Sequence, residues 1–191
     1  RRIRDRDEGR MYVIPCRETE RLALREWRPT DFDALAAFYS DPEVMKFLGG
    51  VMERNDAWRA LASSMGHWGM RGYGTWAVER KSDQALVGRV GLINPEGWPG
   101  LEVGWALGKP YWGQGYASEA AAAAVGFAFV TQPVDRIISC IDPENRASQS
   151  VAERIGETKG EKRMLRIAGK DFGVDIWSIA RDEWQRRIAE A

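Results

Sequence analysis

The feature that most constrains this chain is a strand-like run that leads through a glycine loop into an alanine-rich segment. Apolar residues alternate over residues 102–107, Gly113 and Gly115 flank one glutamine, and residues 116–129 are rich in alanine. Glycine allows positive φ and close approach of the backbone to a ligand. The N-terminus of the helix that follows offers free N–H groups and a favourable dipole for an anion. The pattern predicts either a phosphate-binding strand–turn–helix unit or a purely structural turn.

The order of the glycines separates the kinds of phosphate loop. A P-loop ends in Gly-Lys followed by Ser or Thr, and no such sequence occurs in this chain. A dinucleotide-binding turn lies in an early βαβ unit, with a third glycine and an acidic residue about 20 positions further on. Here the third glycine is missing and the loop lies past the middle of the chain. A nucleotide or dinucleotide enzyme is therefore kept only as an alternative.

The loop PYWGQGYASEA at residues 110–120 resembles the acyl-CoA loop of the GNAT family of N-acetyltransferases. The branch it resembles in particular includes the acetyltransferases of ribosomal-protein N-termini. Four further segments carry the resemblance in the family's order: TERLALR at 19–25, DPEVM at 41–45, EVGWAL at 102–107 and DPENRAS at 142–148. The resemblance covers roughly residues 17–180 and implies an enzyme that uses acetyl-CoA.

Strand and helix patterns are mixed along the chain rather than regularly alternating, which favours an α/β (α+β) fold with a mixed sheet. We expect a central sheet of six to seven strands flanked by helices, in one GNAT-like domain over residues 17–191 after an N-terminal extension at 1–16. Strands are expected near residues 22–27, 73–79, 85–92, 102–107, 136–141, 162–167 and 174–180. Helices are expected after Thr30 as the N-cap, over 55–65, 116–129 and 145–155, and at the C-terminus.

Composition excludes several other classes of protein. The chain has 191 residues with 28 basic and 28 acidic side chains, so no net field draws it to nucleic acid or to an anionic membrane. No apolar run is long enough to cross a bilayer, and no signal sequence opens the chain. Cys16 and Cys140 fit a reducing cytoplasm, and with His67, the single histidine, they cannot supply a closed metal site. We expect a cytoplasmic monomer or homodimer without a metal.

The resemblance implies the cofactor contacts. The main-chain N–H groups of the loop would hold the diphosphate of CoA, and the splayed strand before the loop would pair with the pantetheine arm. An asparagine at the start of a later helix would complete the site. The implied cofactor-binding residues are Trp105, Ala106, Leu107, Gly113, Gln114, Gly115, Tyr116, Ala117 and Asn145.

Two residues are candidates for proton transfer. Glu102 is a candidate general base for the incoming amine, although a solvated carboxylate on the strand is the favoured interpretation. The family's usual acid, a tyrosine, falls on Ala152 in this chain. Ser148, which lies one turn after Asn145, is the substitute that remains, while Asn145 also has the chemistry of a helix N-cap.

Aromatic residues between 58 and 76 are candidates for an acceptor cleft, because this region walls the acceptor side in the resembling family. They are Trp58, Trp68, Tyr73 and Trp76. Packing in the core is the ordinary role of such residues. His67 lies among them, and a packing role is favoured over that of a catalytic base.

Together these residues predict direct transfer of an acetyl group from acetyl-CoA to a primary amine. The acyl donor is a small molecule, and the acceptor is a peptide or protein N-terminus or a small-molecule amine. Pro110, at a position where the family usually has Gln or Arg, and Ala152 motivate the alternative of a non-catalytic acyl-CoA sensor.

Overall fold

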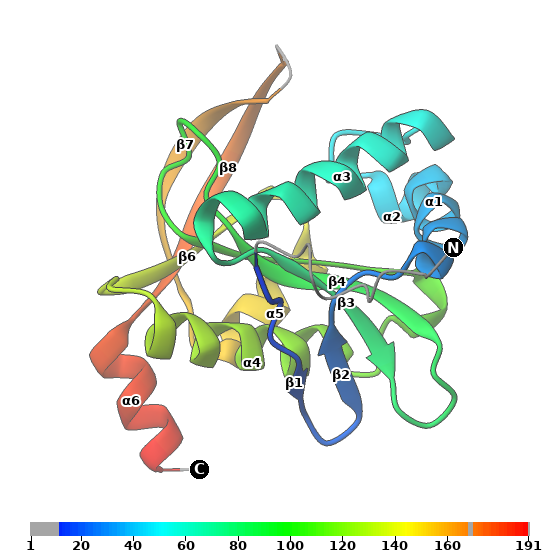
Figure 1. Cartoon of the computed structure of the whole chain (residues 1–191). Coiled ribbons are helices and arrows are strands. Elements are labelled where there is room, and N and C mark those ends of the chain that lie inside the picture. The colour runs from blue at the N-terminus through cyan, green and yellow to red at the C-terminus, as the bar shows by residue number, and fades with distance from the viewer. Residues whose placement is uncertain (1–11, 168–169, 191) are drawn as a thin grey trace.

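A mixed sheet forms the centre of the protein in the computed structural model, which describes residues 12–167 and 170–190 (Figure 1). The strands are β1 (Arg17–Glu18), β2 (Leu22–Arg25), β3 (Thr75–Arg80), β4 (Leu86–Ile93), β5 (Glu102–Leu107), β6 (Arg136–Ile141), β7 (Thr158–Ile167) and β8 (Lys170–Ala180). Their order in the sheet is β1-β2-β3-β4-β5-β6-β8-β7. The eight strands exceed the expected six to seven, because the two-residue β1 pairs with β2 and adds an edge that sequence pattern does not reveal.

Six α-helices lie among the described residues. They are α1 (Phe32–Ser40), α2 (Pro42–Met45), α3 (Arg54–Arg71), α4 (Tyr116–Thr131), α5 (Arg146–Ile155) and α6 (Arg181–Ala189), with short 3-10 turns at Pro29–Asp31 and Lys109–Tyr111. Figure 1 shows α1, α2 and α3 on one side of the sheet and α4 and α5 on the other. The mixed sheet flanked by helices confirms the expected fold class.

Helix α4 packs its alanines on the sheet. Ala120, Ala121, Ala124 and Ala128 are fully buried in the main hydrophobic core. Small side chains let the helix axis approach the strands closely, and their burial removes apolar surface from water. This packing fixes the start of α4, and with it the glycine loop, against the end of β5.

The connection between β2 and α1 differs in detail from the sequence prediction. Thr30 was expected to cap the first helix, but it lies in a 3-10 turn and Asp31 holds the N-cap position. The Asp31 carboxylate instead accepts two hydrogen bonds from the Arg25 guanidinium, at 2.7 and 2.8 Å. Asp41 caps the short helix α2 by accepting from the Glu43 amide at 2.8 Å. The turn is therefore organised by a buried ion pair between segments together with a local cap, in which Asp31 accepts from the Arg28 amide at 2.7 Å.

Five residues of the expected N-terminal extension lie within the described part. The Tyr12 hydroxyl donates to the Met65 carbonyl at 2.9 Å, and the Pro15 carbonyl accepts from the Trp76 indole at 2.7 Å. These contacts attach residues 12–16 to α3 and β3. The remainder of the extension lies outside the described residues, and the division at residue 16 stays a prediction.

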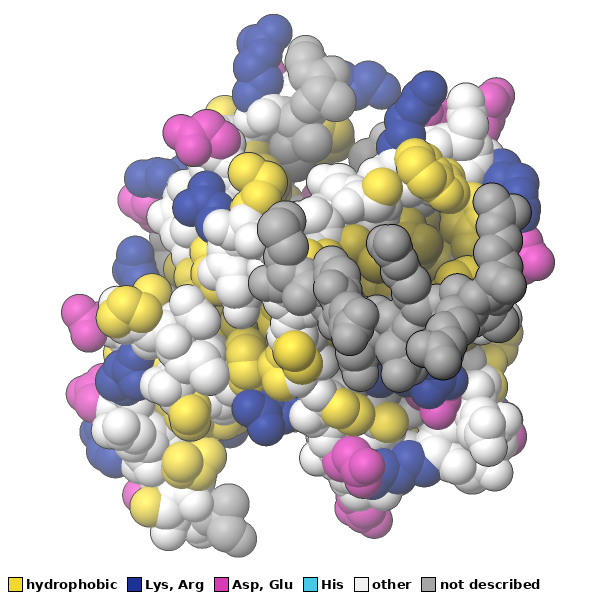
Figure 2. Space-filling view, in the orientation of Figure 1, with side chains coloured by type: hydrophobic (Ala, Val, Ile, Leu, Met, Phe, Trp, Pro, Cys, Tyr) yellow, Lys and Arg dark blue, Asp and Glu magenta, His cyan; other side chains and the backbone are white. Residues whose placement is uncertain are grey.

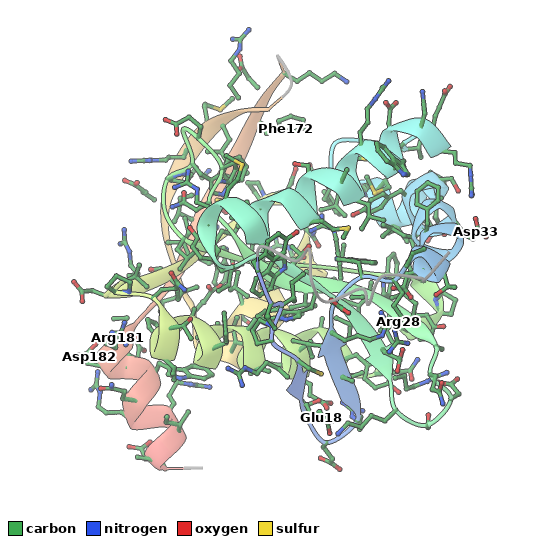
Figure 3. All side chains as sticks on the ribbon, in the orientation of Figure 1. Glu18, Arg28, Asp33, Phe172, Arg181 and Asp182 are labelled. Atoms are coloured by element: carbon green, nitrogen blue, oxygen red, sulfur yellow. The ribbon has the colours of Figure 1, made fainter. Side chains whose placement is uncertain are left out.

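The C-terminal helix is attached through one arginine. Arg181, labelled with Asp182 at the start of α6 in Figure 3, donates to the carbonyls of Phe129, Gln132 and Val134 around the end of α4. A cation at the C-terminal end of a helix is favoured by the orphan carbonyls there.

Candidate active site

The site begins where two parallel strands part. Strands β5 and β6 are the only parallel neighbours in the described sheet, and they share a single registered pair, Glu102 with Ile138. Beyond Glu102 the main chain of β5 has no β6 partner, so the edge at Trp105 is open toward the gap between the strands. The Ser139 hydroxyl donates across this gap to the Val103 carbonyl at 2.9 Å. The expected splayed strand is thus present, with main-chain groups available to a ligand.

The glycine loop presents a row of free amides. Gly113 has φ of 71° and Gly115, the N-cap of α4, has φ of 79°, so both need the conformational freedom of glycine. In the described part of the chain, the N–H groups from Gly113 to Ala117 have no hydrogen-bond acceptor. A Cβ placed at Gly113 would meet no protein atom within 4 Å. The turn is structural and also leaves an uncovered set of donors at a helix N-terminus, the arrangement that binds diphosphates.

Arg21 and Glu119 brace this loop from the side. The Arg21 guanidinium donates to the Gln114 carbonyl at 2.9 Å and to Glu119 Oε2 at 2.7 Å. Glu119 Oε1 accepts from the Thr19 hydroxyl at 2.6 Å. Burial acts to raise the pKa of Glu119, but the hydrogen bonds from Thr19 and Arg21 outweigh it and lower that pKa. A charged carboxylate therefore fixes the loop without using its amides.

A cavity of about 250 Å³ lies next to the splayed strands. Its walls come from the segment after α2, from β4, β5 and β6, from the start of α5 and from the β7–β8 hairpin. Figure 3 labels Phe172 on that hairpin. The polar residues that line the cavity are Arg89, Glu102, Ser139, Asp142, Asn145 and Ser148.

Glu102 is a buried carboxyl group in this cavity. Its side chain accepts hydrogen bonds from the Trp98 indole and, at 3.2 Å, from the Cys140 amide. Burial raises the pKa of Glu102 to about 7, against the opposing effects of these hydrogen bonds and of the Arg89 guanidinium. A solvated strand carboxylate was the alternative, and the 7% exposure of Glu102 rules it out. A carboxyl group with this pKa exchanges protons readily near neutral pH.

Asn145, Ser148 and Trp105 meet at one end of the cavity. Asn145 Oδ1 accepts from the Ser148 amide at 3.1 Å and caps α5, as expected. The Ser148 hydroxyl accepts from the Trp105 indole at 3.2 Å, which leaves its own proton free to be donated. Ala152 is fully buried against Trp177. The position of the family's usual tyrosine is therefore packed with apolar groups. Ser148 supplies the hydroxyl at this end of the cavity.

Four aromatic residues were candidates for the acceptor side, with one or two expected to line a cleft, and the structure places all four away from the cavity. Trp68 and Trp76 pack edge to face in the main core with their ring centroids 4.9 Å apart, and Tyr73 is buried in the same core. Trp58 is 59% exposed on α3. None of the four lines the cavity. The reason is the phase of α3, which places Ala57, Leu61 and Trp68 on the buried face and Trp58 outside it.

His67 has a structural role. Its Nε2 accepts from the Asn94 amide at 3.1 Å, which places the proton on Nδ1, and Nδ1 donates to the Tyr73 carbonyl at 2.8 Å. Both ring nitrogens are occupied, so the ring fastens α3 to the loop before β5. This agrees with the packing role favoured by the sequence.

Sequence reasoning missed three polar groups of the cavity region: Arg89, Ser139 and Glu157. Glu157 is 3% exposed, its Oε1 lies 3.1 Å from the Ser139 hydroxyl, and burial raises its pKa to about 8. A protonated Glu157 donates to Ser139, which in turn donates to Val103. Glu157 follows the glycine that ends α5, and an acidic residue beside a buried strand was the only signal that marked it.

Comparison with known proteins decides the family. A family model described as Acetyltransferase (GNAT) domain matches residues 21–158. The chain belongs to the GNAT acetyltransferase family. The Bacillus subtilis protein YnaD, called an uncharacterized N-acetyltransferase, is 32% identical over 169 residues, which cover 87% of this chain and 97% of that protein. An acetyltransferase structure from Agrobacterium tumefaciens is 30% identical with a TM-score of 0.77, covering 90% of this chain and 98% of that one.

A more distant GNAT structure shows the fold with a ligand. Spermidine N-acetyltransferase from Vibrio cholerae, solved with CoA and spermine, has a TM-score of 0.69 at 18% identity and covers 87% of this chain and 99% of that one. Membership of the family makes this protein an acyltransferase that uses acetyl-CoA. The free amides of the glycine loop and the open edge of β5 fit that cofactor.

The surface shows no strong bias toward one charge on the face drawn in Figure 2, where basic and acidic side chains alternate around the rim. No helix among the described residues has the length and apolar content needed to cross a membrane.

Proposed function

We propose that this GNAT protein transfers the acetyl group of acetyl-CoA directly to a primary amine while both substrates are bound. The observation that carries the proposal is the buried Glu102 carboxyl, with a pKa of about 7, in a cavity beside the open edge of β5. The amine belongs to a peptide or protein N-terminus or to a small molecule. Acetyl-CoA supplies an acyl group already activated as a thioester.

Each step of the reaction has a candidate residue. Glu102 accepts the proton that the amine loses as its nitrogen forms the bond to the acetyl carbon. Amides at the open edge of β5, near Trp105, donate to the carbonyl oxygen as negative charge develops on it. Ser148 donates its hydroxyl proton to the departing sulfur and recovers a proton from solvent. The amides from Gly113 to Ala117 bind the diphosphate and thereby align the reacting atoms, which supplies much of the rate.

A covalent acetyl-enzyme would need an activated nucleophile, and Cys140 is the cysteine that lines the cavity. Burial and the neighbouring Glu102 carboxylate raise the pKa of the Cys140 thiol. The thiolate is the nucleophilic form of cysteine, so this environment disfavours attack by Cys140. Direct transfer is the reaction that the site supports.

Two measurements on the same samples test the proposal. Release of free CoA thiol from acetyl-CoA is followed across a panel of primary amines, and intact mass of the denatured protein is recorded after incubation with acetyl-CoA alone. We expect amine-dependent thiol release and no added acetyl group on the protein. An acetyl group on Cys140 that disappears when amine is added would overturn direct transfer, and absence of release with every amine, despite CoA binding, would overturn catalysis.

A further inference from the structure

A single arginine supplies the cationic side chain among the residues that line the cavity. Arg89 lies on β4, opposite Ala106 of β5, and Glu102 lies opposite Ile93 on the same two strands. Residues directly opposite each other project from the same face of a sheet, and alternate residues along a strand share a face. Arg89 and Glu102 therefore project from the same face of the β4–β5 pair. The basic Arg89 lies at one end of the paired stretch and the acidic Glu102 at the other.

The floor between these two charges is formed by glycine. Gly91 and Gly104 pair with each other midway between Arg89 and Glu102. A Cβ placed at Gly104 would meet only Glu102 Oε1, at 3.9 Å, whereas a Cβ placed at Gly91 would meet the main chain of Gly74 and Thr75, at 2.3 and 2.5 Å. The β5 side of this face, at Gly104, is therefore open between the guanidinium and the carboxyl group, which leaves room for a small ligand to span them.

Arg89 is half-buried, and its guanidinium lacks the partners that an arginine in a protein interior normally has. Its Nε atom is buried without a hydrogen-bond acceptor, and within residues 12–167 and 170–190 Arg89 forms no hydrogen bond or ion pair. Its nearest aromatic contact is the Tyr39 ring, with the guanidinium carbon 5.9 Å from the ring centroid. Arg25, by contrast, is paired with Asp31 and Glu79 at 2.7 Å.

An unpaired buried polar group has a cost in stability and calls for an explanation. Guanidinium groups bind carboxylates through two parallel hydrogen bonds, and the cavity size suits a small molecule. From these observations we infer that the acceptor is a small amine that also carries a carboxylate, with its amine at Glu102 and its carboxylate on Arg89. The inference rests on the proposed amine acetylation and names the class of acceptor.

The same arrangement argues against two other acceptor classes. A polyamine would place a second positive charge near Arg89, and like charges repel in a partly desolvated cavity. A peptide N-terminus would place a neutral carbonyl there, which leaves the guanidinium without a counter-charge. An amino carboxylate satisfies both ends of the cavity.

The test compares matched acceptors. A series of linear amino carboxylates from glycine to 6-aminohexanoate is measured beside the corresponding primary amides, with kcat and KM taken from thiol release. Binding of each pair to the CoA-loaded protein is measured in parallel by calorimetry, so that a result is obtained even without turnover. We expect one chain length to be preferred, with kcat/KM and affinity about 10- to 100-fold higher for the acid than for its amide.

Variants assign the preference to one side chain. Arg89→Met should abolish the difference between acid and amide through a rise in KM for the acid. Kinetics with the amide should stay within about twofold at pH 9, where Glu102 is ionised with or without the neighbouring guanidinium. Arg89→Lys, which keeps the charge but loses the paired donors, should retain part of the preference. Arg186→Met, at a 71% exposed side chain on α6, is the control and should leave both acceptors unchanged.

The outcomes separate this inference from the proposed function. Equal affinity and equal kcat/KM for acid and amide in the unmodified protein would overturn it, as would an Arg89→Met variant that weakens acid and amide alike. Thiol release with amines but without a carboxylate preference would refute only the acceptor class. Preferential acid binding without thiol release would support Arg89 and refute the catalysis.

Discussion

The ionisation of Glu102 controls the pH dependence of this enzyme in our account. With a pKa of about 7, the carboxyl group is about one-tenth ionised at pH 6 and about nine-tenths ionised at pH 8. The free carboxylate is the form that accepts the amine proton, so kcat/KM should rise several-fold over this interval and then level off. An ordinary glutamate, with a pKa near 4.5, would give no step in that range.

Replacing Glu102 with Gln removes the base and keeps the shape of the side chain. General-base catalysis typically contributes about 100- to 10,000-fold, so we expect kcat/KM to fall by at least about 100-fold at pH 8. The step near pH 7 should disappear. The groups that face Glu102 are the Trp98 indole, the Cys140 thiol and amide, the Arg89 guanidinium and Glu157. Of these groups, Glu157 also titrates within the assay range, but its pKa of about 8 places its step about one unit above that of Glu102.

The assay is thiol release from acetyl-CoA at pH 5.5 to 9 with one amine, so that titration of the acceptor is common to both proteins. Glu153→Gln, at an exposed position on α5, is the matched control and should keep the profile of the unmodified protein. If the Glu102→Gln variant retained activity within about threefold and kept the step near pH 7, Glu102 would not be the base.

Three further predictions concern groups around the site. Glu157 has a folded-state pKa of about 8 against an ordinary value of 4.5, so the folded state binds its proton more tightly and stability should fall as pH rises from about 4.5 to 8. Glu157→Gln should remove that decline in the free energy of unfolding, which is worth at most on the order of 4 kcal/mol. The measurement is urea unfolding of both proteins at pH 5 and pH 8.5, and identical declines in the two proteins would contradict the prediction. Glu119→Ala should release Arg21 from the loop and weaken acetyl-CoA binding about 3- to 10-fold in calorimetry, since the pair is partly exposed, and unchanged affinity would show that the brace is dispensable. Ser148→Ala should lower kcat about 100-fold and leave the Kd of acetyl-CoA unchanged, whereas an unaltered kcat would remove Ser148 from the mechanism.

Local signals were sufficient for the conformation of the glycine loop and for several elements. Strand β6 was predicted with the bounds that the structure has, Arg136–Ile141, because a β-branched run is decided by neighbours in sequence. The cap at Asn145 and the turn at Gly113 and Gly115 are also local, since they depend on a side-chain amide and on positive φ. These features need little information from distant parts of the chain.

Tertiary packing decided what the sequence could not reveal. The inward face of α3 is set by which side of the helix packs on the rest of the protein: Ala57, Leu61 and Trp68 are buried, while Trp58 is exposed. The burial of Glu102 and of the Arg89 Nε atom depends on strands brought together by the sheet, so neither the raised pKa of Glu102 nor the missing partners of Arg89 is visible in the sequence.

The central claim is that main-chain amides of the glycine loop bind the diphosphate of acetyl-CoA. Gly113 and Gly72 have nearly equal φ, 71° and 73°, and a Cβ at either position meets no protein atom within 4 Å. Gly113→Val and Gly72→Val should therefore strain the backbone alike, by about 1–2 kcal/mol, while only the first places a side chain in front of the free amides.

The decisive measurement is the Kd of acetyl-CoA by calorimetry for the unmodified protein and these two variants, each shown to be folded by circular dichroism. We predict that Gly113→Val weakens binding by about 100-fold or more and that Gly72→Val stays within about twofold. A folded Gly113→Val variant that binds acetyl-CoA as tightly as the unmodified protein would contradict the account.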